Sequence, residues 1–161
     1  MEGKCILLDT SFFMRLLKQD DPLHKNTLNF YRHFLEKGNR LKCSTISVAE
    51  YCVRGKTEEL PLKNLEILPF NFLHAEKAGQ FACAVYENKN ALNLTTRLII
   101  PNDTNLFAQA HVENEIDYFA TADKECLKVY EFLNSHLSLK FKPINIREPY
   151  HSELGILPFE S

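Results

Sequence analysis

Glycine is scarce in this sequence, with five residues among 161, and no low-complexity run or internal repeat is present. These absences leave no candidate for a flexible linker between two folded units. Apolar residues make up 45% of the chain and charged residues 25%, which are the usual proportions of a globular domain. We therefore expect one domain over residues 1–148, followed by a C-terminal tail over residues 149–161.

Long hydrophobic runs are also missing, since no apolar stretch approaches the roughly 18 residues that a membrane-spanning helix needs. The first four residues, Met1-Glu2-Gly3-Lys4, lead into an apolar run that is too short for a signal peptide and soon reaches Asp9. We therefore expect the protein to stay in the cytoplasm, without membrane contact.

No Cys-x-x-Cys pair occurs, and the number of cysteines, five, is odd. The cysteines are scattered along the chain: Cys5, Cys43, Cys52, Cys83 and Cys126. This spacing disfavours both a zinc site and a disulfide framework. We expect reduced and mostly buried thiols.

The net charge of −2 and the isoelectric point of about 6.3 do not indicate nucleic-acid binding. A polyanionic ligand would need a local basic patch or a bound metal ion to attract it. This balance is the main observation in the sequence against a nucleic-acid function.

Strand-like and helix-like segments alternate along the chain. The expected strands are residues 4–8, 41–44, 65–70, 117–123 and 142–148. The expected helices are residues 10–18, 23–37, 45–55, 73–89, 102–115 and 124–136, and residues 97–101 are expected to be an apolar approach to a turn. This alternation predicts an α/β fold with a mostly parallel sheet covered on both faces. Ligands of such sheets bind at the carboxyl ends of the strands.

Four acidic residues occupy places where an isolated carboxylate is costly. In the stretch "CILLDTSFFM", Asp9 ends an apolar strand, and Asp123 ends a later one. Asp103 falls in the first turn of an expected helix, and Glu50 lies within the apolar stretch "ISVAEYCV". In a doubly wound sheet, all four side chains can converge on one crevice.

Carboxylates that converge repel one another unless a cation lies between them. Mg²⁺ and Mn²⁺ prefer oxygen ligands, and such sites serve phosphoryl chemistry. Each acid also has a structural interpretation. Asp9 and Asp123 can cap the helices that follow them, Asp103 can favour the positive end of its helix, and Glu50 can lie on an exposed side. Four such placements together favour the metal site.

The ordered set of motifs resembles the PIN domain, the metal-dependent nuclease fold of many VapC-type toxins. The resemblance extends over residues 4–148 and rests on "LLDTSFFM", "STISVAEYCV" and "IIPNDTNLFAQAHVENEIDYFATADKE". The family pattern is a strand ending in Asp-Thr/Ser-Ser, a helical Glu, an Asp that opens a helix rich in small residues, and a strand ending in Thr/Ser-x-Asp. This likeness implies a three-layer α/β/α fold.

The resemblance also implies a function, an endoribonuclease that uses Mg²⁺ or Mn²⁺, often dimeric and inhibited by a small antitoxin. By position, the catalytic and metal-binding acids would be Asp9, Glu50, Asp103 and Asp123. The side chains that orient them would be Thr10, Asn102 and Thr121. We expect in-line hydrolysis of RNA that leaves a 5′-phosphate and a 3′-hydroxyl.

Basic residues close to these motifs in the sequence are candidates for contacts with the RNA backbone: Arg15, Lys18, Arg54, Lys56 and Lys124. The structural alternative for each is a solvated surface charge. Arg15, Arg54 and Lys124 are the three that we carry forward.

Other classes of protein share parts of this pattern. A phosphoacceptor receiver domain expects an acidic pair after its first strand, whereas Asp9 stands alone. A structure-specific DNA nuclease needs additional DNA-clamping elements, for which this chain is short. A non-catalytic PIN-like module that binds protein or RNA is the main alternative, and the negative net charge and the apolar tail favour it.

Overall fold

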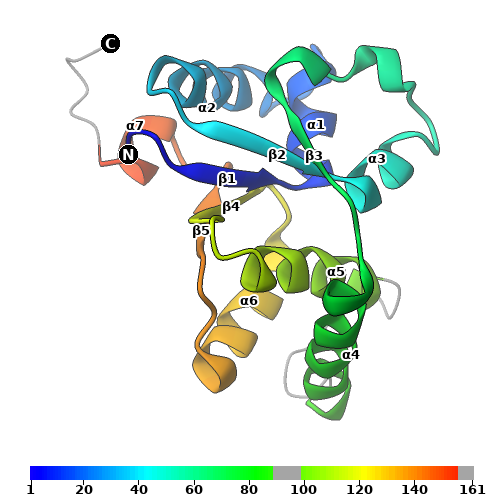
Figure 1. Ribbon diagram of the computed structural model, residues 1–161. Coiled ribbons are helices and arrows are strands. Elements are labelled where there is room, and N and C mark those ends of the chain that lie inside the picture. The colour runs from blue at the N-terminus through cyan, green and yellow to red at the C-terminus, as the bar shows by residue number, and fades with distance from the viewer. Residues whose placement is uncertain (89–98, 156–161) are drawn as a thin grey trace.

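The computed structural model describes residues 1–88 and 99–155, and within them five strands form one parallel sheet in the order β3-β2-β1-β4-β5. The strands are β1 (Cys5–Leu8), β2 (Arg40–Ser44), β3 (Glu66–Leu68), β4 (Tyr118–Thr121) and β5 (Lys142–Asn145). The predicted α/β fold with a mostly parallel sheet is confirmed, and every pairing in it is parallel (Figure 1).

The predicted helices are all present with shifted ends. They are α1 (Thr10–Leu17), α2 (His24–Glu36), α3 (Thr45–Tyr51), α4 (Phe72–Glu87), α5 (Ile99–Val112) and α6 (Lys124–Leu137). The short elements η1 (Thr57–Glu59), η2 (Leu62–Asn64) and α7 (Tyr150–Glu153) were not predicted. A single helical turn carries too little hydrophobic periodicity to be recognised from sequence.

The start of α5 corrects one prediction. The expected helix 102–115 begins three residues earlier, at Ile99, so the expected approach to a turn is helical from residue 99 onward, and residues 97–98 lie outside the described residues. Pro101 is compatible with this start, because the first N–H groups of a helix have no partner within it. Asp103 consequently lies in the second turn of α5 and not in the first.

The sheet separates two layers of helices (Figure 1). Side chains of β1 alternate between them, since Ile6 and Leu8 pack with α1 and α2, while Cys5 and Leu7 pack with α4, α5 and α6. Both layers are filled mainly by aromatic and aliphatic side chains, with Phe12 on one side and Phe107 on the other fully buried. The three-layer α/β/α arrangement places the carboxyl ends of all strands at one edge.

The central strands β1 and β4 are neighbours although more than 100 residues separate them in the sequence. Leu8 is paired with Ala120, and the N–H group of Asp9 donates to the carbonyl of Ala120 at 3.0 Å. The chain leaves the sheet on either side of this pair, toward β2 from β1 and toward β5 from β4. Such a switch in strand order opens a crevice at the carboxyl ends, and Asp9 and Asp123 both follow strands that end there.

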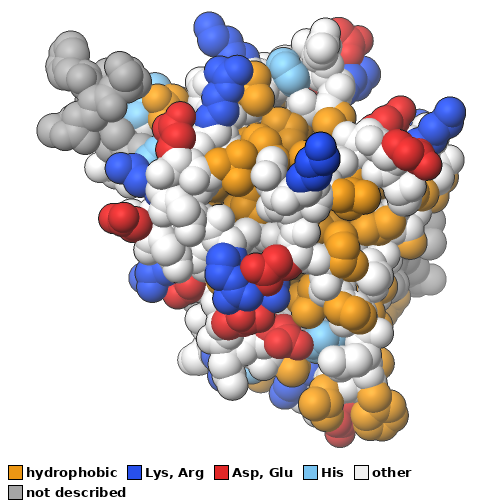
Figure 2. Space-filling view, turned by 45° about the horizontal axis from the view of Figure 1, so that its top comes forward, with side chains coloured by type: hydrophobic (Ala, Val, Ile, Leu, Met, Phe, Trp, Pro, Cys, Tyr) orange, Lys and Arg blue, Asp and Glu red, His pale blue; other side chains and the backbone are white. Residues whose placement is uncertain are grey.

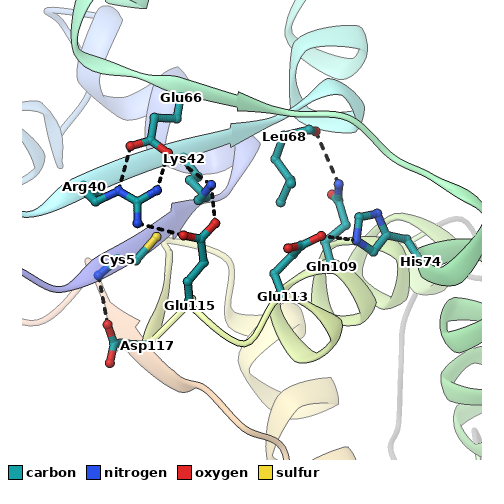
Figure 3. A network of polar contacts seen from close by, with 10 residues as sticks. All are labelled: Cys5, Arg40, Lys42, Glu66, Leu68, His74, Gln109, Glu113, Glu115 and Asp117. Atoms are coloured by element: carbon teal, nitrogen blue, oxygen red, sulfur yellow. Dashed lines mark hydrogen bonds and ion pairs between the residues drawn. The ribbon is translucent and has the colours of Figure 1, made fainter.

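A buried lysine joins the sheet to the segment that follows α5 (Figure 3). Lys42 in β2 is only 7% exposed, and its Nζ lies 2.7 Å from Glu115 Oε1 and 3.1 Å from Glu66 Oε2. Arg40 donates to the same two carboxylates from the exposed side of the cluster. These ion pairs hold Glu115, which follows α5, against strands β2 and β3.

We expect Lys42→Met to lower the free energy of unfolding by about 1–2 kcal/mol, because two carboxylates lose a buried cationic partner while the aliphatic stem is kept. Lys128→Met is the matched control, because Lys128 forms an exposed pair with Glu125 and should cost about 0.5 kcal/mol or less. Urea unfolding of both variants measures the difference. Equal losses in the two variants would contradict a stabilising role for Lys42.

The expected tail begins with α7, and the ring of Tyr150 lies edge-on to Phe30 of α2, with 6.2 Å between the ring centroids. Asn26 Nδ2 also donates to the carbonyls of Ile146 and Glu148, at 2.7 and 2.8 Å. Residues 156–161 lie outside the described residues, and the domain boundary at residue 148 stays a prediction. In the part of the chain that is described, no helix has the length and apolar character to cross a membrane.

Candidate active site

An acidic pocket of about 300 Å³ opens at the carboxyl ends of β1 and β4. Its lining consists of Asp9, Thr10, Ser11, Met14, Glu50, Asn102, Asp103 and Asp123. The structure therefore brings all four predicted acids together, with two of the three side chains predicted to orient them. Thr121, the third of these side chains, does not line the pocket but donates a hydrogen bond to Asp9. Among the described residues, no basic side chain belongs to the lining.

Asp9 is buried at the floor of this pocket and caps α1 at the same time. Its Oδ1 accepts from the N–H of Thr10 at 2.7 Å, and its Oδ2 accepts from the hydroxyls of Thr121, at 2.8 Å, and Ser11. Burial raises the pKa of Asp9, and the hydrogen bonds from Ser11 and Thr121 partly offset this effect. The capping and pocket-lining interpretations of Asp9 therefore both hold.

Asp123 likewise caps a helix and lines the pocket. Its Oδ1 accepts from the N–H groups of Glu125 and Cys126 at the start of α6, at 2.7 and 3.3 Å. Its own N–H donates to Thr121 Oγ1 at 3.0 Å. Thr121 is thus hydrogen-bonded to both Asp9 and Asp123, which fixes the two acids relative to each other across β1 and β4.

Glu50 reaches the pocket from α3. Glu50 and Asp123 are half-buried, whereas Asp9 and Asp103 are buried. Thr10 Oγ1 donates to its Oε2, and Asn102 Nδ2 donates to its Oε1. Thr10 and Asn102 were predicted to orient the site acids, and the structure assigns both of them to Glu50. The carboxylate is therefore directed into the pocket and is not free on an exposed side of its helix.

Asp103 is the acid with the least local compensation. It is 7% exposed, and its Oδ2 has no hydrogen-bond partner among the described residues. Burial, together with the nearby carboxylates of Asp9, Asp123 and Glu50, raises the pKa of Asp103 to about 8. An acid in this position either keeps a proton near neutral pH or is neutralised by a cation.

The donors of the pocket fit a hard divalent cation in kind, because they are carboxylates, hydroxyls and an amide, and no described basic side chain lies among them. The unpartnered Oδ2 of Asp103 is the atom that most requires such a partner. Within residues 1–88 and 99–155, no three His, Cys, Asp or Glu side chains are arranged to hold one ion together as they stand. Asp9, Glu50 and Asp123 accept hydrogen bonds from neighbours, and the lone pairs that these bonds leave would bind the ion.

The predicted RNA contacts lie around the pocket and not in it. Arg15 and Arg54 line a larger groove next to it, where Arg15 also pairs with Asp21. Lys124 is exposed and follows Asp123 as the first residue of α6. Arg147 was not predicted, and its Nε donates to the carbonyl of Ala122 at 2.7 Å, which places a cation directly beside the turn that carries Asp123.

Two further residues at the site were not predicted to support it. Ser11 Oγ donates to Asp9 and accepts from the N–H of Ala122 at 2.9 Å, so it links the ends of β1 and β4. The fully buried thiol of Cys126 lies beside Asp103 and Thr121. The signal for Ser11 was its position two residues after a capping Asp, where a short hydroxyl can reach back to the carboxylate. Cys126 has no comparable signal in the sequence.

We expect Ser11→Ala to weaken Mn²⁺ binding by about 10- to 100-fold, because an orienting hydrogen bond to Asp9 is lost. The N–H group of Ala122 also loses its partner, at a cost of about 1–2 kcal/mol in the free energy of unfolding. Calorimetric titration and thermal unfolding measure the two effects. Ser135→Ala is the control, since Ser135 is exposed and hydrogen-bonds to Phe132 and His136 within α6. Unchanged metal affinity in Ser11→Ala would contradict the orienting role.

Comparison with known proteins identifies the fold. Over 86% of its length, this chain matches 98% of a chain in the crystal structure of VapBC2 from Rickettsia felis bound to a DNA fragment from their promoter, with a TM-score of 0.56 and 17% identity. It also matches 98% of a chain in the DNA-bound VapBC structure from Salmonella typhimurium over 89% of its own length, with a TM-score of 0.56 and 15% identity. No family model and no curated protein matches the sequence.

At this level of identity the matches show the fold, which is the three-layer α/β/α fold of a PIN domain. Both matched chains belong to VapBC structures, and their fold is the one that the sequence motifs predicted.

Proposed function

We propose that this protein is a metal-dependent endoribonuclease that hydrolyses RNA phosphodiester bonds, and that it acts as the toxin of a toxin–antitoxin pair. The observation that carries the proposal is the buried Asp103, whose Oδ2 has no hydrogen-bond partner in the described residues and which shares a pocket with three other acids. The VapC-like fold supports the same conclusion, because VapC proteins are PIN-domain toxins.

Asp9, Asp103 and Asp123 would hold the cation, with Glu50 as a further ligand or as a base. A bound Mg²⁺ or Mn²⁺ supplies positive charge against the growing charge of the phosphate oxygens and lowers the pKa of water. Glu50 is suited to accept a proton from the attacking water, because its carboxylate is oriented by Thr10 and Asn102 and is less buried than Asp103. Thr121 and Ser11 keep Asp9 in position.

Cations around the acidic pocket would bind the RNA backbone on either side of the scissile phosphate. Arg15 and Arg54 lie on the groove side, and Lys124 and Arg147 lie on the side of β4 and β5. These local positive charges offset the negative net charge of the chain, since they are placed where the phosphates would lie.

Two protein partners belong to the proposal. The matched structures are VapBC complexes, which supports an antitoxin as partner. A homodimer is favoured by exposed apolar side chains at the start of α4 and in β3, where Phe72 is 82% exposed and Leu73 and Ile67 are also exposed. Figure 2 shows hydrophobic side chains gathered over a broad area of one face, interrupted by clusters of both charges.

The test is cleavage of a mixed pool of structured RNAs by the purified protein in Mn²⁺, in Mg²⁺ and in EDTA. We expect cleavage with either metal, none in EDTA, and none by Asp9→Asn in any condition. Asp117→Asn is the control, because Asp117 lies at the amino end of β4, away from the pocket.

Cleavage that persists in EDTA would contradict the metal-dependent mechanism. A folded wild-type protein that neither cleaves RNA nor binds Mn²⁺ would favour the non-catalytic binding module. Mn²⁺ binding without cleavage would support the cation site and leave the choice of RNA as the point to correct.

A further inference from the structure

Ala122 and Asp123 form the short connection between β4 and α6, so the place of Asp123 in the acidic pocket depends on the backbone of Ala122. We propose that Arg147 is a positioning residue for Asp123, and that Asn26 of α2 keeps Arg147 in place. The proposal rests on the proposed function in one respect, because it concerns the cation affinity of the same site.

The peptide groups of Ala122 are held from two sides. Its N–H donates to Ser11 Oγ at 2.9 Å, and its carbonyl accepts from Arg147 Nε at 2.7 Å. The N–H of Ile146 donates to the carbonyl of Thr121 at 2.9 Å, so the bond from Arg147 extends the contact between these two segments by one residue. Arg147 thereby fixes the backbone at the point where the chain leaves β4 and turns toward Asp123.

Asn26 binds the backbone on both sides of Arg147. Its Nδ2 donates to the carbonyls of Ile146 and Glu148, at 2.7 and 2.8 Å, and its Oδ1 accepts from the N–H of Tyr150 at 3.2 Å. Both N–H groups of the amide and its oxygen are therefore engaged with this one segment. A single side chain of α2 thus determines the path of the backbone that carries Arg147.

The residues around this segment support the same geometry. The N–H of Arg147 donates to Asn145 Oδ1 at 3.0 Å, and the N–H of Asn145 donates to Glu153 Oε1 at 2.8 Å. The ring of Tyr150 lies edge-on to Phe30, so α7 is held beside α2 (Figure 1). Together with Asn26, these contacts direct the side chain of Arg147 back toward Ala122.

The charge of Arg147 and its positioning role have opposite effects on a bound cation. A guanidinium beside Asp123 repels Mn²⁺, so its removal would by itself strengthen Mn²⁺ binding. Positioning requires the reverse, because loss of a residue that orients a metal ligand weakens metal binding by about 10- to 100-fold. Arg147 acts through the backbone of Ala122, and we therefore expect the lower end of this range. The sign of the change separates the two roles.

The first measurement is a calorimetric titration of the metal-free protein with Mn²⁺. We expect Arg147→Met and Asn26→Ala each to weaken binding about tenfold. Lys124→Met is the charge comparator, since Lys124 is exposed and directly follows Asp123, and it should bind Mn²⁺ as tightly as wild type or more tightly. Asn29→Ala changes a half-buried asparagine of the same helix as Asn26 and should leave the Mn²⁺ affinity unchanged.

The second measurement needs no cation. Amide hydrogen exchange in EDTA, followed by nuclear magnetic resonance, reports on the N–H of Asp123, which donates to Thr121 Oγ1 at 3.0 Å. We expect this N–H to exchange at least several-fold faster in Arg147→Met and in Asn26→Ala than in wild type. The N–H of Asp9, which donates to the carbonyl of Ala120, should exchange as in wild type.

The outcomes separate this proposal from the proposed function. Weaker Mn²⁺ binding and faster exchange at Asp123 in both variants would support the positioning role. If wild type binds no Mn²⁺, the proposed function fails, and faster exchange at Asp123 still supports the positioning of its backbone. Mn²⁺ affinity that is unchanged or higher in Arg147→Met, as in Lys124→Met, would overturn the proposal. Effects confined to one of the two variants, or unchanged exchange at Asp123 in both, would also overturn it.

Discussion

Asp103→Asn should lower the rate of RNA cleavage by about 100-fold or more, which corresponds to about 2.7 kcal/mol in transition-state free energy. The reason is that the amide cannot replace the carboxylate as an anionic ligand in the acidic pocket. The same substitution should raise the melting temperature of the metal-free protein at pH 8. It removes a buried charge that lies beside Asp9, Asp123 and Glu50 and whose Oδ2 has no hydrogen-bond partner among the described residues.

The opposite signs of these two effects distinguish a functional site from a structural one. A carboxylate kept for stability would make the amide variant both less active and less stable. Asp117→Asn provides the comparison, since Asp117 accepts from the N–H of Cys5 at 2.9 Å at the far end of the sheet, and its loss should not affect cleavage. Full activity in Asp103→Asn would contradict its assignment to the site.

The metal-free protein should become less stable as the pH rises from about 5 to about 8. The folded state holds a proton on Asp103, whose pKa is raised to about 8, while the unfolded chain releases it near the ordinary Asp value of about 3.9. Because the folded state binds more protons in this range, the free energy of unfolding falls with pH, by about 1.4 kcal/mol per pH unit for each proton retained. The raised pKa of Asp9 acts in the same direction.

The lowered pKa values of His33 and His111, caused by burial, oppose this trend below about pH 6.5 and no longer do so above it. Other shifted carboxyls do not oppose it within that range. Hydrogen bonds from Arg40 and Lys42 lower the pKa values of Glu66 and Glu115. The hydrogen bond from the N–H of Cys5 lowers the pKa of Asp117. Stability from such groups is present above their unfolded pKa and is lost only as the pH falls through the lower folded value, below about pH 4.

Urea unfolding at pH 5, 6, 7 and 8 measures the trend, in EDTA and in excess Mg²⁺. We expect a falling curve in EDTA, a flatter one for Asp103→Asn, and partial recovery of wild-type stability with Mg²⁺ at high pH, because the cation takes the place of the proton. A wild-type curve that is flat or rises from pH 7 to pH 8 in EDTA, above the range in which His33 and His111 titrate in the unfolded chain, would contradict the raised pKa of Asp103.

The strands and the four acids could be predicted from sequence because their signals are local. Cys5–Leu8 is a continuous apolar run that ends at Asp9, Glu50 lies within an apolar stretch, and Asp103 and Asp123 stand near the starts of helices that follow apolar segments. The order of helices and strands then sufficed to bring the acids to one edge of the sheet. The predicted start of α5 was wrong because Pro101 is compatible with either a turn or the first turn of a helix.

What could not be predicted depends on contacts between distant segments. The hydrogen bond from Ala122 to Ser11 joins residues 111 positions apart, and Arg147 reaches Ala122 only once β4 and β5 are paired. The larger groove beside the acidic pocket combines side chains of α1 and α3 with residues of η1 and α5. Which acid lacks a partner is also a property of packing, and no local pattern distinguished Asp103 from Asp9 in this respect.

The most direct test of the central claim, that the four acids form a divalent cation site, is a titration of the metal-free protein with Mn²⁺ followed by electron paramagnetic resonance. We expect saturable binding that Mg²⁺ competes with, that Asp103→Asn weakens at least about tenfold, and that Asp117→Asn leaves unchanged. Absence of binding by the folded wild type, or equal affinity in wild type and Asp103→Asn, would contradict the claim.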